Sequence, residues 1–255
     1  MRVTGVDAAR RGWVAVSLEA VPLEGVSLAA VSLAAVCLDG VSPAGAPAVT
    51  VRTAASLAAL LGPCLDAADA GTLSDGPIVG IDMPLGLLEA GWREPDRAAR
   101  RLLGPRRSSV FAIPPRAVWA EASYAAANQR CRELTGQGFS VQAWGLRPKL
   151  LEANTYRETC GHPLYEVHPE LAFGAMAGAP LAASKHAGPG RDLRRALLAR
   201  AGIALPAGIP ATLEGDVLDA AAVAWSARRI AAGLAVTIPA SPQHDRHGRE
   251  IAIRY

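Results

Sequence analysis

Two short hydrophobic segments of the chain each end in a single aspartate. Residues 2–7 read RVTGVD and residues 78–82 read IVGID, and both have the composition of buried β-strands. A carboxylate at the end of a buried strand is costly to keep ionised without a cationic partner. Asp7 and Asp82 would meet at the carboxyl edge of a sheet, where α/β proteins bind ligands. The pair predicts a divalent-metal site; the alternative is that each aspartate only begins a turn.

A second pair of acids stands near the start of the helix predicted over residues 216–232. Asp216 and Asp219 have the i, i+3 spacing that puts two side chains on one helical face. Helix capping and a first-turn acid would explain the same two residues in structural terms.

A third group is formed by Glu166, His168 and Glu170. If the strand predicted over residues 164–168 continued to Glu170, alternation would put these three side chains on one face. Acids and imidazoles are metal ligands or general bases. Pro169 makes strand geometry beyond His168 doubtful. A solvated edge strand is the alternative.

Basic and glycine-rich segments could bind phosphate. Arg106 and Arg107 precede Ser108 and Ser109, and arginines and hydroxyls suit phosphate oxygens. Residues 184–191 (SKHAGPGR) lead into a predicted helix, and their backbone amides could cradle a phosphate with Lys185 and Arg191; the order differs from that of a P-loop. A solvated basic loop explains the first segment equally well.

The grouped acids favour a cation. Two carboxylates ~4 Å apart repel each other by roughly 4 kcal/mol at an effective dielectric near 20. Several together are tolerated when some are protonated or a metal is bound. Ligands that are all oxygen favour Mg²⁺ or Mn²⁺ over zinc.

The elements that must position these residues follow the order strand, strand, strand, helix, strand, and then a helical middle. The first strands are predicted over 3–7, 13–18, 48–52 and 77–82, and the first helices over 56–70, 95–103, 121–134 and 142–158. A short strand at 164–168 and helices at 191–201 and 216–232 follow. Further strands are predicted near 235–238 and 251–255. A repeat of five residues between Val26 and Leu38 indicates a loop insertion.

Composition narrows the protein class. The 255 residues are 51% hydrophobic and 19% charged, with a formal net charge of +3, which is typical of a globular protein rather than a disordered one. The four cysteines are far apart, which argues against zinc-finger or disulfide frameworks and favours a reduced compartment. With no signal peptide and no membrane span in the sequence, we expect a cytoplasmic location and no membrane partner.

Six motifs taken together resemble domain-of-unknown-function family 429, whose members are predicted nucleases with a ribonuclease-H-like fold. The resemblance covers about residues 2–233. The motifs are Gly5–Asp7 followed by Gly12–Trp13, Gly80–Gly86, Arg106–Phe111, Tyr165–Glu170, Ser184–Lys185 and Asp216–Ala220.

The resemblance implies an α/β fold with a five-stranded mixed sheet, its first three strands antiparallel, flanked by helices. We expect a single domain over 1–255, with a repetitive loop insertion at about 20–47 and a helical insertion at about 84–160. In the ribonuclease-H-like superfamily, acids lie on the first strand, at the end of the fourth and on the last helix. Asp7, Asp82, Asp216 and Asp219 match those places, and Glu166 is either a further acid or a support for Lys185.

The leading hypothesis is a Mg²⁺- or Mn²⁺-dependent nuclease that hydrolyses phosphodiester bonds in DNA or RNA. The metal ligands would be Asp7, Asp82 and Asp219. The catalytic set would add Glu166, Asp216 and Lys185, and the substrate-binding set would be Arg106, Arg107, Ser108, Ser109, His168 and Arg191. Two alternatives stay open: an actin-like or sugar-kinase-type phosphotransferase or NTP-hydrolysing enzyme, and a non-catalytic binding module.

Overall fold

A computed structural model describes residues 2–19, 49–62, 77–159, 163–185 and 187–255. Its centre is a seven-stranded sheet of order β3-β2-β1-β4-β5-β7-β6. The predicted repetitive loop at 20–47 lies outside the described residues. Among the described residues, no helix is both long and apolar enough to cross a membrane.

The first three strands are antiparallel, as predicted. Strand β4 pairs with β1 in parallel, β5 pairs with β4 in parallel, and β7 pairs with β5 in parallel. The strands are β1 (Arg2–Ala9), β2 (Gly12–Glu19), β3 (Val49–Ala54), β4 (Ile78–Ile81), β5 (Leu164–Val167), β6 (Thr237–His244) and β7 (Glu250–Arg254).

The prediction of five strands was wrong, because the C-terminal segment extends the sheet by an antiparallel pair. The outer edge of β5 is paired by β7, with Glu166 opposite Ile253 and Val167 opposite Arg254. Ile251, Ala252 and Ile253 are buried there, so the pairing satisfies backbone groups and covers apolar surface together.

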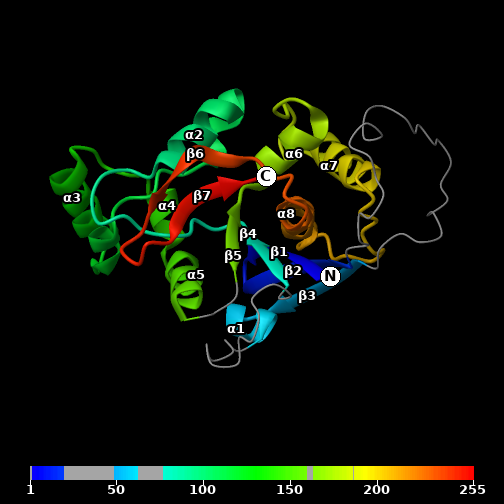
Figure 1. Cartoon of the computed structure of the whole chain (residues 1–255), viewed down its shortest axis with the longest axis horizontal. Helices are drawn as coiled ribbons and strands as arrows, with labels where there is room; N and C mark the ends of the chain where they lie inside the picture. The colour runs from blue at the N-terminus through cyan, green and yellow to red at the C-terminus, as the bar shows by residue number, and fades with distance from the viewer. Residues whose placement is uncertain (1, 20–48, 63–76, 160–162, 186) are drawn as a thin grey trace.

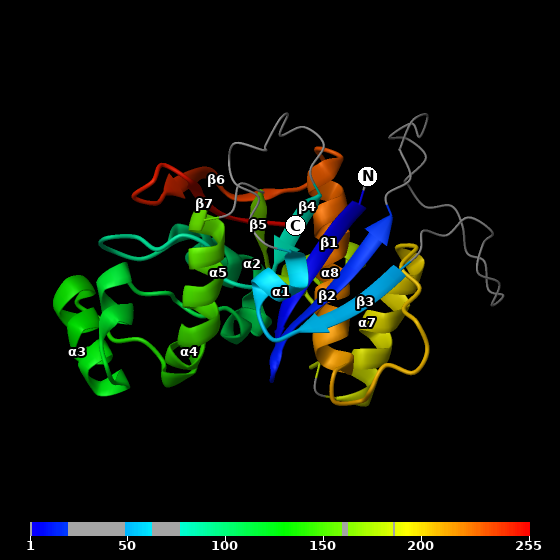
Figure 2. The same ribbon diagram turned by 90° about the horizontal axis from the view of Figure 1, so that it is seen from below.

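Helices cover both faces of the sheet (Figure 1, Figure 2). Helices α6, α7 and α8 lie on one face, and α1 and α5 lie on the other. The helices are α1 (Leu57–Leu61), α2 (Glu94–Leu103), α3 (Tyr124–Thr135), α4 (Val141–Gly145), α5 (Arg147–Thr159), α6 (Pro169–Ala177), α7 (Gly188–Arg200) and α8 (Glu214–Ala231), with 3₁₀ turns η2 (Gly104–Ser109) and η3 (Arg116–Ala120).

The helices differ most from the predicted ones in three places. The helix predicted over 56–70 ends at Leu61, where Gly62 has a φ of 96°, and its remainder falls on residues 63–76, outside the described part. The helix predicted over 142–158 is divided into α4 and α5. Pro169 begins α6 rather than only ending a strand, because proline is well suited to the first turn of a helix.

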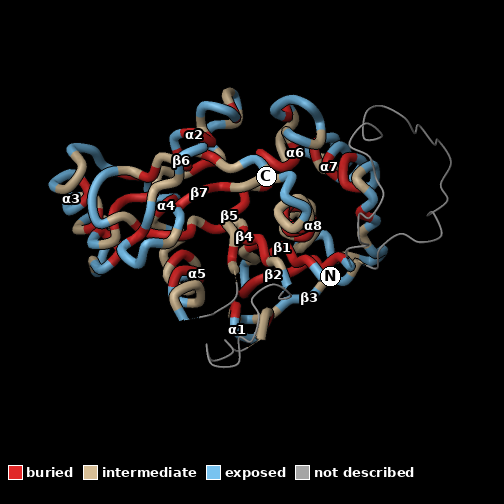
Figure 3. The backbone as a smooth tube through the Cα atoms, viewed as in Figure 1, coloured by how far each residue is buried: buried red, intermediate tan, exposed pale blue. Residues whose placement is uncertain are grey.

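Buried residues follow the strands and the inner faces of the helices (Figure 3). One core joins Val6 and Ile81 to Leu150 of α5, and another joins Val3 and Val16 to α8. Helix α8 can approach β1 so closely because residue 5 is glycine: a Cβ at Gly5 would lie 2.1 Å from the backbone nitrogen of Ala224. This close packing sets the distance between the acids of α8 and those of the sheet.

Candidate metal centre and adjoining cavities

Three aspartates from three elements converge at the carboxyl edge of the sheet. Asp7 lies on β1, Asp82 follows β4 directly, and Asp219 lies on α8. One oxygen from each carboxylate can be chosen so that all lie within 4.8 Å of one another. The two strands are neighbours, with Val6 opposite Ile81, and the Asp82 amide donates to the Val6 carbonyl at 2.8 Å. The strand register therefore brings Asp7 and Asp82 together as predicted.

Burial and mutual repulsion disfavour ionisation of these acids. Burial, followed by the charges of Asp82 and Asp219, raises the pKa of Asp7 well above its usual value. Burial and the charge of Asp219 raise the pKa of Asp82 to about 7. The triad is thus a site where added positive charge would be stabilising.

Lys185 supplies part of that positive charge. Its Nζ donates to Asp219 Oδ2 at 2.6 Å. Burial lowers the pKa of Lys185, but the neighbouring carboxylates, Asp219 first, outweigh this effect and raise it above its usual value. The lysine therefore stays charged, and one ammonium faces three carboxylates.

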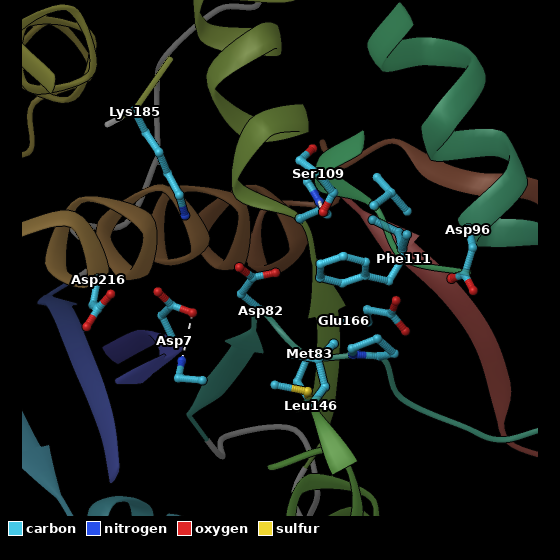
Figure 4. A pocket seen from close by; sticks show the side chains of 15 residues that line it. Asp7, Asp82, Met83, Asp96, Ser109, Phe111, Leu146, Glu166, Lys185 and Asp216 are labelled. Atoms are coloured by element: carbon cyan, nitrogen blue, oxygen red, sulfur yellow. Dashed lines mark hydrogen bonds between the residues drawn. The ribbon is translucent and has the colours of Figure 1, made fainter. Parts of the chain in front are cut away.

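A cavity of about 270 Å³ opens beside the triad (Figure 4). Asp7, Asp82, Asp216 and Lys185 line it, together with residues that lie further along the strand ends. Asp216 is on α8 as predicted, but Asp219 rather than Asp216 belongs to the close group of three. Burial and Asp219 raise the pKa of Asp216. We call this space the first cavity.

A second cavity of about 380 Å³ adjoins the same acids. Asp82, Asp219 and Lys185 line it together with residues of the basic turn η2. The lining residues from the predicted phosphate-binding set are Arg106, Ser108, Ser109 and His168. The sequence motif at 106–109 is thereby brought beside the aspartate triad.

Two predicted substrate-binding residues lie elsewhere. Arg107 is exposed on η2, and it lines neither cavity. Arg191 is on α7, where its Nε lies 3.7 Å from Glu214, and it also lines neither cavity. Of the predicted phosphate-binding segment 184–191, Lys185 lies at the aspartate triad and Arg191 does not.

Glu166 lies in a separate ionic group. Its Oε2 accepts from the Leu85 amide at 2.7 Å and from Arg93, which is itself 3.5 Å from Asp96. Burial raises the pKa of Glu166 to about 7, although Arg93 opposes the effect. The bonding partner of Lys185 is Asp219 rather than Glu166.

The expectation that Glu166, His168 and Glu170 share one strand face was wrong, because β5 ends at Val167 and Glu170 lies in the first turn of α6. Both Glu170 oxygens accept from Arg194 Nη2 at 2.7 Å, and Oε1 also lies 3.1 Å from Arg106. Glu170 thus forms ion pairs with the fully buried Arg194 and with Arg106, and it orients the Arg106 side chain.

His168 lines both cavities. Its Nε2 lies 3.3 Å from the Ser109 carbonyl, and burial lowers the pKa of the imidazole. A neutral ring that donates from Nε2 would leave Nδ1 as an acceptor, and Nδ1 is buried without a hydrogen-bond partner among the described residues.

Sequence reasoning missed most of the wall of the first cavity. Met83, Asp96, Phe111 and Leu146 all line it. Phe111 is only the last residue of the Arg106–Phe111 motif, and the sequence does not mark Asp96 as a cavity residue. No periodicity marks these residues, because loops and separate elements bring them together.

The fold and the site define a mixed α/β protein with a carboxylate triad that could hold a metal ion. The chain belongs to the family described as "Protein of unknown function (DUF429)", whose model matches residues 5–244. Neither the curated proteins nor the solved structures contain a match to it.

Proposed function

We propose that this protein is a divalent-metal-dependent nuclease with a ribonuclease-H-like fold. The observation that carries the proposal is the convergence of Asp7, Asp82 and Asp219, whose carboxylate oxygens lie within 4.8 Å of one another. Three buried or half-buried acids from three different elements have no structural need to meet, since each could cap or turn the chain alone.

The topology supports the fold assignment. The strand order β3-β2-β1-β4-β5 has three antiparallel strands followed by parallel ones, which is the arrangement that the family resemblance implies. The three acids come from the first strand, from the end of the fourth and from the last helix, as in that superfamily. The strands β6 and β7 are additions to this pattern.

The donor set fits a hard cation. All three groups are carboxylates, which suit Mg²⁺ or Mn²⁺. The pKa values of Asp7 and Asp82 are raised by burial first and by neighbouring negative charge second, and a bound cation would favour the ionised carboxylates. When bound, a divalent cation would supply charge stabilisation and an activated water for phosphodiester hydrolysis.

The surrounding residues suit a phosphate-containing substrate. Lys185 stands beside Asp219 with a side chain 40% exposed, so its ammonium can contact an incoming phosphate. Arg106, Ser108 and Ser109 line the second cavity and would bind a neighbouring phosphate of DNA or RNA. Glu170 fixes the orientation of Arg106.

The test is cleavage of end-labelled single-stranded and duplex DNA and RNA with Mg²⁺, Mn²⁺ or EDTA. We expect cleavage that depends on the cation and falls at least about a hundredfold in Asp7→Asn, an effect typical of losing a charged transition-state contact. The matched control is Asp192→Asn, which changes an exposed aspartate of α7 and should cleave like the wild type.

Two results would count against the proposal. Full cation-dependent cleavage by Asp7→Asn would show that the triad is not the reactive centre. Hydrolysis of ATP by the wild type, with no cleavage of any oligonucleotide, would favour the phosphotransferase alternative instead.

A further inference from the structure

The first cavity extends well beyond the aspartate triad. Figure 4 shows Asp7 and Asp216 at one end, Asp82 between, and Glu166 with Phe111 toward the other end. Glu166 pairs with Ile81 in the register of β4 and β5, and partners in register point to the same face. Ile81 belongs to the core on the α5 side, whereas Gly80 faces α8. The cavity therefore passes around the strand ends from one face of the sheet to the other.

The far end combines an apolar wall with an unsatisfied acceptor. Phe111, Met83 and Leu146 line the cavity. Glu166 is only 5% exposed, and its Oε2 takes both described hydrogen bonds, from Leu85 and Arg93. Its Oε1 has no hydrogen-bond partner among the described residues. This oxygen is not among the fully buried polar atoms that lack a partner, and Glu166 lines the cavity. Oε1 can therefore accept a hydrogen bond from a ligand N–H group in the cavity.

The charge balance points to the same kind of ligand. Arg93 lies between two buried acids, Glu166 and Asp96, so one guanidinium faces two carboxylates. Two carboxylates against one guanidinium disfavour anions at this end, and Glu166 and Asp96 on the cavity wall can accept from ligand N–H groups beside the ring of Phe111. The phosphate-compatible residue Lys185 lies at the opposite end of the same cavity.

We propose that the far end of the first cavity binds one unpaired nucleobase of the substrate, with Phe111 against the base and Glu166 Oε1 accepting an N–H of its edge. This inference rests on the proposed nuclease function and adds a substrate preference to it. A base inside a duplex cannot reach the cavity, so the substrate is single-stranded or carries an unpaired base beside the cleaved phosphate. Glu166 is then a recognition residue rather than a metal ligand.

The experiment compares the binding of GMP and ribose 5-phosphate to the full chain in Mg²⁺, by calorimetry at pH 8.5. At that pH the Glu166 carboxyl, whose pKa is about 7, is ionised. Stacking and the base-edge hydrogen bond should make GMP bind about tenfold or more tightly than ribose 5-phosphate. In Glu166→Gln, we expect the amide oxygen to keep the hydrogen bonds from Leu85 and Arg93. The NH₂ group then takes the Oε1 position and cannot accept a hydrogen bond from the N–H of the base.

We therefore expect Glu166→Gln and Phe111→Leu each to reduce the GMP advantage to less than about threefold, with ribose 5-phosphate affinity unchanged. Phe139→Leu is the matched control, because Phe139 packs against Trp119 and Tyr124, away from both cavities. Equal affinities for GMP and ribose 5-phosphate in the wild type would overturn the proposal, and so would an advantage that neither variant reduces.

The cleavage assay separates this inference from the function on which it rests. Cleavage of single strands with no base-dependent binding would remove the base pocket and leave the nuclease proposal intact. Base-dependent binding without any cleavage would support the pocket and count against the nuclease.

Discussion

Replacing Asp82 with asparagine should stabilise the protein when no divalent cation is present. The pKa of Asp82 is raised from 3.8 to about 7 in the folded protein, by burial and then by Asp219. The folded state therefore holds the proton more tightly than the unfolded chain does. Stability that comes from this group is present at low pH and is lost as the pH rises from about 4 to about 7.

The size of the effect follows from the two pKa values. A rise from 3.8 to about 7 corresponds to about 4 kcal/mol of destabilisation once Asp82 is ionised. Asn keeps the shape of the side chain and removes the charge. In EDTA at pH 8.5, we expect Asp82→Asn to have a higher free energy of unfolding than the wild type, by up to about 4 kcal/mol. At pH 4 the two proteins should be nearly equal.

Urea denaturation at both pH values measures this difference, with Asp192→Asn as the exposed control. A saturating divalent cation should narrow the difference, because a ligand at 100-fold over its Kd stabilises the wild type by about 2.7 kcal/mol and the variant binds it less tightly. The reasoning is refuted if Asp82→Asn is less stable than the wild type in EDTA at pH 8.5, or if the difference does not change with pH.

Three further substitutions test other parts of the structure. Lys185→Met leaves a buried carboxylate without its donor, so the melting temperature in EDTA should fall, by the equivalent of about 1–3 kcal/mol, and cleavage should be lost; unchanged cleavage would exclude the lysine from the reaction. Gly5→Ala puts a Cβ 2.1 Å from the backbone of α8, so urea denaturation should show a loss of more than about 3 kcal/mol, whereas Gly215→Ala, with open space around its Cβ position, should be neutral or slightly stabilising. Glu170→Gln removes the charged partner of the fully buried Arg194 and should cost about 3–5 kcal/mol in the same assay; a cost below 1 kcal/mol would show that the pair is not important for stability.

The strand-end aspartates were predictable because local sequence determines them. A hydrophobic run followed by Asp7 or Asp82 predicts both the strand and the position of the acid at its end, and parallel pairing then aligns the two ends. The i, i+3 spacing likewise predicted an acidic helix face, and Asp219 was predicted as the third metal ligand beside Asp7 and Asp82; the spacing alone does not determine why Asp219 rather than Asp216 joins them. That choice depends on how α8 crosses Gly5, which is a tertiary contact.

The remaining features depend on contacts between distant parts of the chain. Arg194 lies 24 residues from Glu170, and nothing in the local sequence marks either as a buried pair. The extension of the sheet depends on the parallel pairing of β7 with the outer edge of β5. Arg93 is 1% exposed between Glu166 and Asp96, although arginines are mostly surface residues. Burial of charge is set by tertiary packing, so residue type alone does not predict it.

The most direct test of the central claim is a crystal of the wild-type protein soaked in Mn²⁺ and measured for anomalous scattering. The account predicts an anomalous peak in bonding contact with the carboxylates of Asp7, Asp82 and Asp219, and loss of that peak in Asp7→Asn. A saturated soak that shows no peak at these three residues, or a peak held by other groups, would contradict it.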